Sequence, residues 1–216
     1  MTPEPGAAGL LEGRSLGCQR GRRRLFEQQD IALPPTSITW LRGANGSGKT
    51  SLMRILAGLS APAAGQVLWN GLPLRQAGAA ARLGVIYIGH SNALKDDLTL
   101  HESLAFLARL AGHDNPEARA TAALGCLGLA TRARAPVRTL SQGQRRRGAL
   151  ARLALDDRPR TWILDEPYDA LDGVSMQALS ALLSGHAARG GAVLLTSHQD
   201  VALPGLREHR LQAPGL

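Results

Sequence analysis

The stretch Gly43–Thr50 reads GANGSGKT and fits the pattern G-x-x-x-x-G-K-[ST] at every fixed position. Its glycines let the backbone wrap closely around phosphate oxygens, and successive N–H groups form an anion-binding nest. Lys49 would reach the β- and γ-phosphates and act in catalysis, and the hydroxyl of Thr50 would bind Mg²⁺. The residues expected to bind the phosphates are Gly43, Ala44, Asn45, Gly46, Ser47, Gly48, Lys49, Thr50 and Ser51.

Two adjacent carboxylates, Asp165 and Glu166, follow the apolar residues of the stretch TWILDEP. Ligands of parallel sheets bind at the carboxyl ends of the strands, where these acids are expected to lie. Asp165 would hold Mg²⁺, through water, and Glu166 would accept a proton from an attacking water as a general base. The alternative is a pair of solvated acids at a strand end, but the phosphate loop elsewhere in the chain favours the catalytic interpretation.

A third candidate is His198, which ends the apolar run of the stretch LLTSHQ. Since it terminates a predicted buried strand, we expect it at the same sheet edge as the phosphate loop, in contact with the γ-phosphate as a catalytic residue. Four other histidines lie in helical or loop contexts without a supporting pattern. We predict that these four lie on the surface: His101, His113, His186 and His209.

A second loop that could bind an anion lies in the stretch TLSQGQRRR, where Ser141, Gly143 and Gln144 precede a basic helix. A helix N-terminus offers free backbone N–H groups to an anion. One chain would then have two phosphate-binding loops, although a single nucleotide cannot use both if they lie on different lobes.

Short apolar runs between turn residues predict the strands that would position these loops. Strands are expected within Gly13–Cys18, Arg24–Leu33, Ser37–Gly43, Gly65–Gly71, Leu83–His90, Thr161–Pro167 and Ala192–His198. Helices are expected after the phosphate loop, within 100–129 with a break near His113–Pro116, after Gly143, and over Ser175–Arg189. Strands that alternate with helices predict an α/β fold with a parallel sheet. The stretch from His90 to about Leu140 has no predicted strand and would form a helical insertion.

Length and composition limit the classes of protein that fit. The 216 residues suggest one domain over 10–216, with the helical insertion at about 90–140 as a subdomain, preceded by a flexible tail over 1–9. The formal net charge of +8 comes almost entirely from arginine, which fits nucleic acid, an anionic membrane surface or a compositional bias. Cys18 and Cys126 give no disulfide framework and no metal-binding spacing, so a reducing compartment is expected.

No apolar run approaches the roughly 18 residues of a membrane-spanning helix. The first residues, MTPEPGAAG, lack the basic and apolar regions of a secretory signal. The chain also ends soon after His198. We therefore expect that any membrane-embedded part of a working complex comes from other subunits.

The order of the phosphate loop, LSQGQ, ILDEP, ALD and SHQ resembles that of the ATP-binding cassette (ABC) ATPases along nearly the whole chain. Leu140–Gln144 resembles their signature sequence LSGGQ, with Gln142 in place of a glycine. The resemblance implies a nucleotide-binding domain of the P-loop NTPase type that binds ATP and Mg²⁺ and has antiparallel N-terminal strands. It also implies a head-to-tail homodimer in the ATP-bound state, which gives two composite sites. Ser141, Gly143 and Gln144 would then bind the partner's nucleotide, and Ala170–Asp172 would cross the interface.

Two positions depart from the family pattern. His90 stands where most ABC ATPases have a glutamine that senses Mg²⁺ and water and links the core to the helical insertion. An imidazole could take this role, including that of a metal ligand, or His90 could merely end a strand. The family often stacks adenine on an aromatic residue near the N-terminus, where this chain reads CQRGRRRLF. Arg20 or Arg22 could stack on the base instead, or this could be a solvated basic turn.

Longer stretches resemble one branch of the ABC ATPases, the heme-exporter ATP-binding subunits of cytochrome c maturation (the CcmA family). These stretches include YIGHSNALKDDLTLHESLAFL and TWILDEPYDALD. The resemblance implies an ATPase coupled to heme export or to release of a heme chaperone, with integral membrane subunits of the cytochrome c maturation complex as partners. It places the chain at the cytoplasmic face of the inner membrane.

We expect no direct heme binding, since no Cys-x-x-Cys-His is present, and no nucleic-acid partner. Two alternatives stay open. One is the ATPase subunit of another ABC exporter, for a lipid or drug. The other is a soluble ABC ATPase of iron–sulfur assembly or nucleic-acid repair.

Overall fold

The computed structural model describes residues 9–212. The expected N-terminal tail therefore lies outside the described residues, except for Gly9, which is buried beside Trp69 and Asn70. The chain divides into two compact units. The first contains the described residues up to Gly89, Arg158–Glu166 and the described residues from Leu183. The second contains His90–Asp157 and Pro167–Leu182, so it includes the expected helical insertion and extends beyond it.

A parallel sheet of five strands forms one layer of the first unit, in the order β6-β7-β8-β3-β9. Its strands are β3 (Ser37–Arg42), β6 (Val85–Ile88), β7 (Thr161–Leu164), β8 (Ala192–Leu195) and β9 (Leu206–Arg210). All residues of β7 and β8 are buried, as expected for apolar runs in a parallel sheet that is covered on both faces. Since all neighbouring strands are parallel, the ends of β3, β7 and β8 lie at one edge.

An antiparallel sheet forms a second layer, in the order β2-β1-β4-β5. Its strands are β1 (Leu11–Arg20), β2 (Arg23–Leu33), β4 (Ala64–Trp69) and β5 (Leu72–Pro73). The stretch predicted as Gly65–Gly71 is β4, which pairs with β1 and ends in a tight turn to β5. The short strand β5 was not expected from the sequence, because two residues give no periodic pattern.

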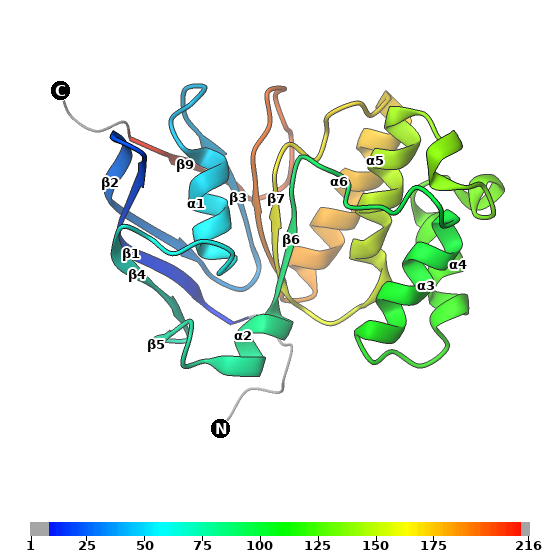
Figure 1. Ribbon diagram of the computed structural model, residues 1–216, viewed down its shortest axis with the longest axis horizontal. Helices are drawn as coiled ribbons and strands as arrows, with labels where there is room; N and C mark the ends of the chain where they lie inside the picture. Colours follow the sequence, from blue (N-terminus) through cyan, green and yellow to red (C-terminus); the bar gives the residue numbers. More distant parts are fainter. Residues whose placement is uncertain (1–8, 213–216) are drawn as a thin grey trace. The chain divides into compact units, whose positions relative to one another are not determined.

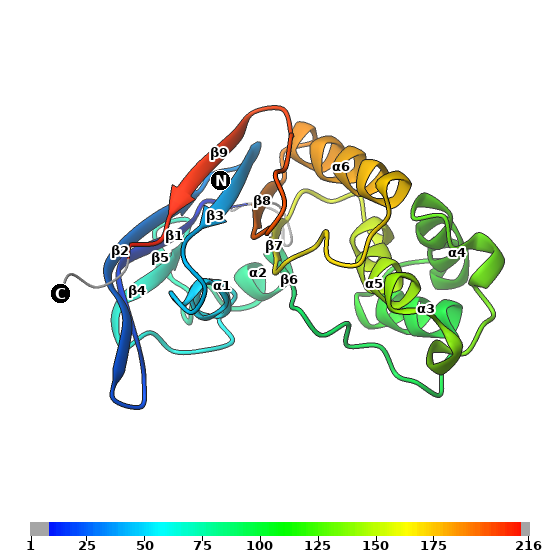
Figure 2. The same cartoon turned by 90° about the horizontal axis from the view of Figure 1, so that it is seen from above.

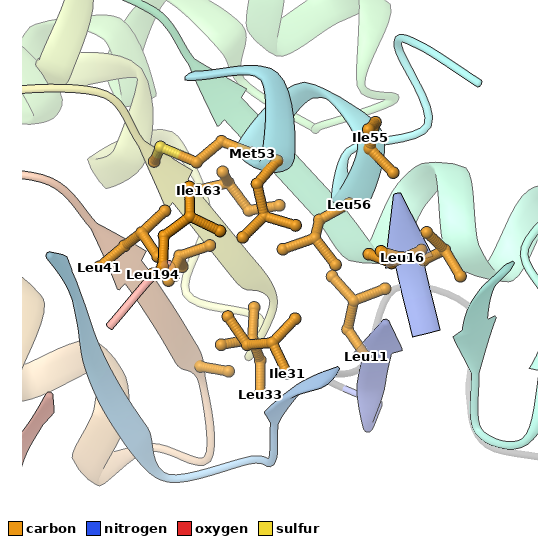
Figure 3. Packing of buried hydrophobic residues seen from close by; sticks show 14 of the residues in the cluster. Leu11, Leu16, Ile31, Leu33, Leu41, Met53, Ile55, Leu56, Ile163 and Leu194 are labelled. Carbon is orange, nitrogen blue, oxygen red and sulfur yellow. The ribbon is translucent and has the colours of Figure 1, made fainter. Parts of the chain in front are cut away.

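Helix α1 (Lys49–Leu56) lies between the two sheets of the first unit (Figures 1 and 2). Figure 3 shows Leu56 on the side of Leu11 and Leu16 from the antiparallel sheet, and Met53 close to Ile163 from the parallel sheet. Since both faces of α1 pack on apolar strands, the helix has a fixed position. The phosphate loop, which leads into the N-terminus of α1, is therefore attached to a helix with a fixed position.

The second unit consists of helices with no β-strand in its described part. It contains α3 (Leu100–Leu110), α4 (Pro116–Cys126) and α5 (Gln142–Leu150), whereas α6 (Gly173–Ala188) contributes residues to both units. Thr99 and Glu102 form a capping box that starts α3, and Pro116 is the first residue of α4. The capping box explains where α3 begins, and Pro116 explains the predicted break between α3 and α4 (Figure 2).

The predicted α/β fold, with a parallel core, antiparallel N-terminal strands and a helical insertion, is confirmed. Helix α2 (Gly78–Gly84) was not predicted, because its seven residues, rich in alanine and glycine, show no apolar periodicity. Within residues 9–212, no helix combines the length and the apolar character that crossing a membrane requires.

The prediction that four histidines lie on the surface is wrong for His186 and His113, and His209 is partly buried with its Nε2 covered. The ring of His186 is fully buried and stacks on Trp162, with ring centroids 3.4 Å apart. Its Nε2 lies 2.8 Å from the carbonyl oxygen of Arg160, and the space for the ring exists because residue 191 is glycine. The side chain of His113 is 8% exposed, and its Nε2 lies 3.5 Å from Oδ2 of Asp156. Both contacts join residues far apart in the chain, so no local pattern could predict them.

Candidate nucleotide-binding and hydrolysis site

The phosphate loop, Gly43–Ser51, runs from the end of β3 into the first turn of α1. Gly46 has a φ of 76° and Gly48 a φ of 103°, conformations that residues with a side chain rarely adopt. The ammonium of Lys49 donates hydrogen bonds to the carbonyl oxygens of Gly43 at 2.8 Å and Ala44 at 3.3 Å. The lysine is therefore folded over its own loop, in a position to exchange these carbonyls for phosphate oxygens.

The hydroxyl of Ser47 supports the fit of this loop to a phosphate chain. It is buried, and within residues 9–212 it has no hydrogen-bond partner. A buried polar group without a partner costs free energy, so a bound ligand that supplies one would be stabilised. A phosphate oxygen is an acceptor that suits a hydroxyl in an anion-binding loop.

Thr50 connects the phosphate loop to the carboxyl end of β7. Its hydroxyl donates a 2.8 Å hydrogen bond to Oδ2 of Asp165, a residue with 4% of its surface exposed. The structure therefore brings together two of the residues that the sequence nominated for Mg²⁺. Their oxygens suit this ion, which is typically bound by one or two protein oxygens, substrate phosphates and water.

Thr196 is a residue of this site that the sequence reasoning missed. Its fully buried hydroxyl donates to Oδ1 of Asp165 at 3.0 Å and accepts from the backbone N–H of Glu166 at 2.8 Å. The only local signal was a threonine directly after the apolar run of β8. Since β8 lies beside β7, this one side chain orients both adjacent acids.

Glu166 and His198 lie side by side, as the sequence predicts for two residues at one sheet edge. The backbone N–H of His198 donates to Oε2 of Glu166 at 3.0 Å, and Nε2 of its ring lies 3.6 Å from Oε1. The imidazole is 59% exposed, so it is available to a ligand. Glu166 has a φ of 48°, which is rare outside glycine, and such backbone strain often occurs at functional sites.

Tyr87 on β6 adds a neutral hydroxyl near Asp165. Burial raises the pKa of this tyrosine above its usual value, and the negative charge of Asp165 raises it further. A hydrogen bond and the positive charge of Arg54 act in the opposite direction on this pKa. The phenol therefore stays protonated at neutral pH and adds no negative charge beside Asp165.

The second loop nominated from the sequence begins helix α5. Ser141 and Gln144 form a reciprocal capping box: the hydroxyl of Ser141 accepts from the N–H of Gln144 at 3.3 Å, and Oε1 of Gln144 accepts from the N–H of Ser141 at 3.0 Å. A Cβ at Gly143 would lie 2.7 Å from the carbonyl oxygen of Ala170. Residue 143 must therefore be glycine for this helix start to approach the loop around Ala170 so closely.

His90 lies in the second unit with its side chain 79% exposed. Its Nδ1 is 3.9 Å from a carboxylate oxygen of Asp169, and this contact is an ion pair only when the imidazole is protonated. Asp172, in the same loop as Asp169, accepts from the N–H of Ser175 at 2.8 Å. Hydrogen bonds from the side chain and the backbone of Ser175 lower the pKa of Asp172.

Arg20 and Arg22, the two candidates for stacking on a base, are exposed at the hairpin turn between β1 and β2. Gly21 between them has a φ of 57°, which allows the tight turn.

Comparisons with known proteins give the family. Residues 26–169 match the protein-family model described as "ABC transporter". The chain is 44% identical to the "Cytochrome c biogenesis ATP-binding export protein CcmA" of Nitrosomonas europaea, over 98% of this chain and 99% of that protein. It is 45% identical to the protein of the same name from Dechloromonas aromatica, over 94% of this chain and all of that protein.

Solved structures agree with this relationship. One titled "Structure of ATP binding subunit of ABC transporter" has a TM-score of 0.77 and 27% identity, over 88% of this chain and 79% of that one. A putative ABC transporter ATP-binding protein from Pyrococcus furiosus has a TM-score of 0.80 over 94% of this chain and 97% of that one, and at 21% identity it supports the fold alone. This chain belongs to the ABC transporter ATPases and, among them, to the CcmA family of ATP-binding subunits.

Proposed function

We propose that this chain is the ATP-hydrolysing subunit of an export complex that drives heme export, or release of a heme chaperone, in cytochrome c biogenesis. The observation that carries this proposal is the 44–45% identity, over nearly their whole lengths, to proteins named for ATP-binding export in cytochrome c biogenesis. The site adds chemical support, because Thr50, Asp165 and Glu166 are joined through hydrogen bonds that include Thr196.

The phosphate loop binds the triphosphate of ATP through its backbone N–H groups and the ammonium of Lys49. Thr50 and Asp165 would hold Mg²⁺, which would supply positive charge beside the phosphates. Glu166 accepts a proton from the attacking water. His198 supports the reaction from beside Glu166, where its ring contacts the γ-phosphate.

The signature loop, Leu140–Gln144, completes the site of a second copy of the chain in the ATP-bound homodimer. The hydroxyl of Ser141 accepts a hydrogen bond within the capping box, and its own proton stays available to donate to a phosphate oxygen. The first N–H groups of α5 add the positive end of the helix dipole. ATP binding therefore brings two chains together, and hydrolysis lets them separate.

The helical unit transmits this cycle to integral membrane subunits of the cytochrome c maturation complex, at the cytoplasmic face of the inner membrane. His90, which begins this unit, senses the state of the nucleotide site and its Mg²⁺. Heme itself is handled by the partner subunits, and no nucleic acid takes part.

The test is to replace the gene in cells with one encoding Glu166→Gln. We expect these cells to make apocytochromes c and to fail at covalent heme attachment, measured by heme staining of separated proteins. Glu27→Gln, the same substitution at an exposed surface pair, is the matched control and should support normal attachment. Normal c-type cytochromes in Glu166→Gln cells, together with loss of export of another compound or of a nucleic-acid or iron–sulfur function, would contradict the heme assignment.

A further inference from the structure

The first residues of β2 lie against the phosphate loop. A Cβ at Gly48 would lie 3.1 Å from the Cβ of Leu25 and 3.0 Å from the ring of Phe26. A Cβ at Gly46 would lie 4.0 Å from a terminal guanidinium nitrogen of Arg23. Strand β2 therefore supplies the loop with apolar contacts and, two residues earlier, with an arginine side chain.

The backbone of the β1–β2 hairpin explains why this arginine reaches the loop. Cys18 of β1 pairs with Phe26 of β2, and the next residue, Gln19, pairs with Arg24. Leu25 is therefore an extra residue in β2 and forms a β-bulge. A bulge redirects the neighbouring side chains and increases the local twist. The turn at Gly21 closes just before it, with Arg20 and Arg23 as cross-strand partners. The hairpin thus brings Arg23 beside the loop, whereas Arg20 and Arg22 are not among the residues nearest to the loop's glycines.

The charge of Arg23 is not neutralised by a neighbour. Within residues 9–212 no carboxylate forms an ion pair with it, whereas the adjacent Arg24 pairs with Glu27 at 2.5 Å. A free guanidinium next to an anion-binding nest strengthens the positive potential of that nest. Its planar set of donors also matches two phosphate oxygens at once, a geometry that a lysine ammonium does not offer.

We propose that Arg23 is a nucleotide-binding residue whose guanidinium contacts the phosphate chain of the nucleotide in the Gly43–Ser51 loop. This inference rests on the proposed function of that loop as the ATP site. Arg23, on β2, adds a second cation to Lys49, which begins α1.

The test measures affinities of the purified chain for ATP, ADP and inorganic tripolyphosphate by calorimetry, at constant salt and free Mg²⁺. Arg23→Ala should weaken all three ligands by about tenfold, the size expected for loss of a hydrogen bond to a charged group. The affinities of Arg23→Lys should lie between those of Arg23→Ala and the unsubstituted chain, because lysine keeps the positive charge but lacks the planar guanidinium donors. Arg24→Ala removes the same charge one residue away and should leave all three affinities unchanged.

Three outcomes would overturn the inference. Equal losses of affinity in Arg23→Ala and Arg24→Ala would mean that only the overall positive potential matters, and not a contact made by Arg23. Loss for ATP with unchanged binding of tripolyphosphate would place the guanidinium on the base or ribose. Unchanged affinities in Arg23→Ala, with Lys49→Ala still weakening ATP binding, would overturn the role of Arg23 alone. If Lys49→Ala also binds ATP normally, the loop is not the ATP site. Failure of the role of Arg23 can therefore be distinguished from failure of the proposed function. Arg23 is exposed, and matching thermal unfolding curves confirm that the variants are folded.

Discussion

The buried hydroxyl of Thr196 donates a 3.0 Å hydrogen bond to Oδ1 of Asp165, from the residue that follows β8 to the residue that follows β7. The same hydroxyl accepts from the N–H of Glu166 at 2.8 Å. One threonine therefore orients the proposed Mg²⁺ ligand through its side chain and the proposed general base through its backbone. This arrangement leads to the first prediction.

Thr196→Val keeps the shape of the side chain and removes both hydrogen bonds. We expect kcat for ATP hydrolysis to fall at least tenfold with a smaller change in ATP affinity, and stability to fall by about 1–3 kcal/mol, the usual cost of losing buried hydrogen bonds. Thr196→Ser retains the hydroxyl and should keep most of kcat. Steady-state kinetics and denaturant unfolding measure the two effects. A Val variant that is less stable yet has normal kcat would limit Thr196 to a structural role.

Lys49 and Glu166 should affect different steps. Lys49→Ala removes a positive charge from the phosphates, so ATP affinity should fall. Glu166→Gln should bind ATP normally and hydrolyse it about 10²–10⁴-fold more slowly, the usual loss when a general base is removed. This variant should accumulate as an ATP-bound dimer, detected by light scattering after chromatography, while Glu27→Gln behaves as the unsubstituted chain. Hydrolysis at the normal rate in Glu166→Gln would refute the assignment of the base.

The signature loop should act on the nucleotide of the partner chain. A mixture of chains with Lys49→Ala and chains with Ser141→Arg contains heterodimers, in which one composite site has both changes and the other has neither. Some ATPase activity should return in the mixture, although each variant alone is inactive. Differently tagged chains allow the heterodimer to be isolated. Isolated heterodimers without activity would count against the shared site.

His90 should couple the nucleotide cycle to the membrane partner. Its side chain is exposed and lies 3.9 Å from Asp169. We expect His90→Ala to lower partner-stimulated hydrolysis more than basal hydrolysis, measured with and without the membrane subunits. His90→Gln introduces the residue most ABC ATPases have there and should restore stimulation. An equal loss of basal and stimulated rates would place His90 in the chemical step, as a group acting on Mg²⁺ or water.

The features that could be predicted from the sequence depend on residues close together in the chain. The glycines and Lys49 of the phosphate loop follow one strand and open one helix, so their spacing alone indicates anion binding. Asp165, Glu166 and His198 follow apolar runs, and the parallel arrangement of such strands puts their ends at one edge. The sequence by itself thus determined the fold class and the proposed ATPase residues.

Only the tertiary structure decided which other residues support the proposed ATPase residues. Thr196 meets Asp165 because β8 pairs with β7, and Arg23 lies near Gly46 because the start of β2 packs against the phosphate loop. His186 is buried because Trp162 lies beside it, although nothing in its own helix marks it as a core residue. Each case depends on strand pairing or packing between segments distant in the chain. In these cases the role of a side chain depends on the residues that contact it from other segments, and local residue patterns do not contain that information.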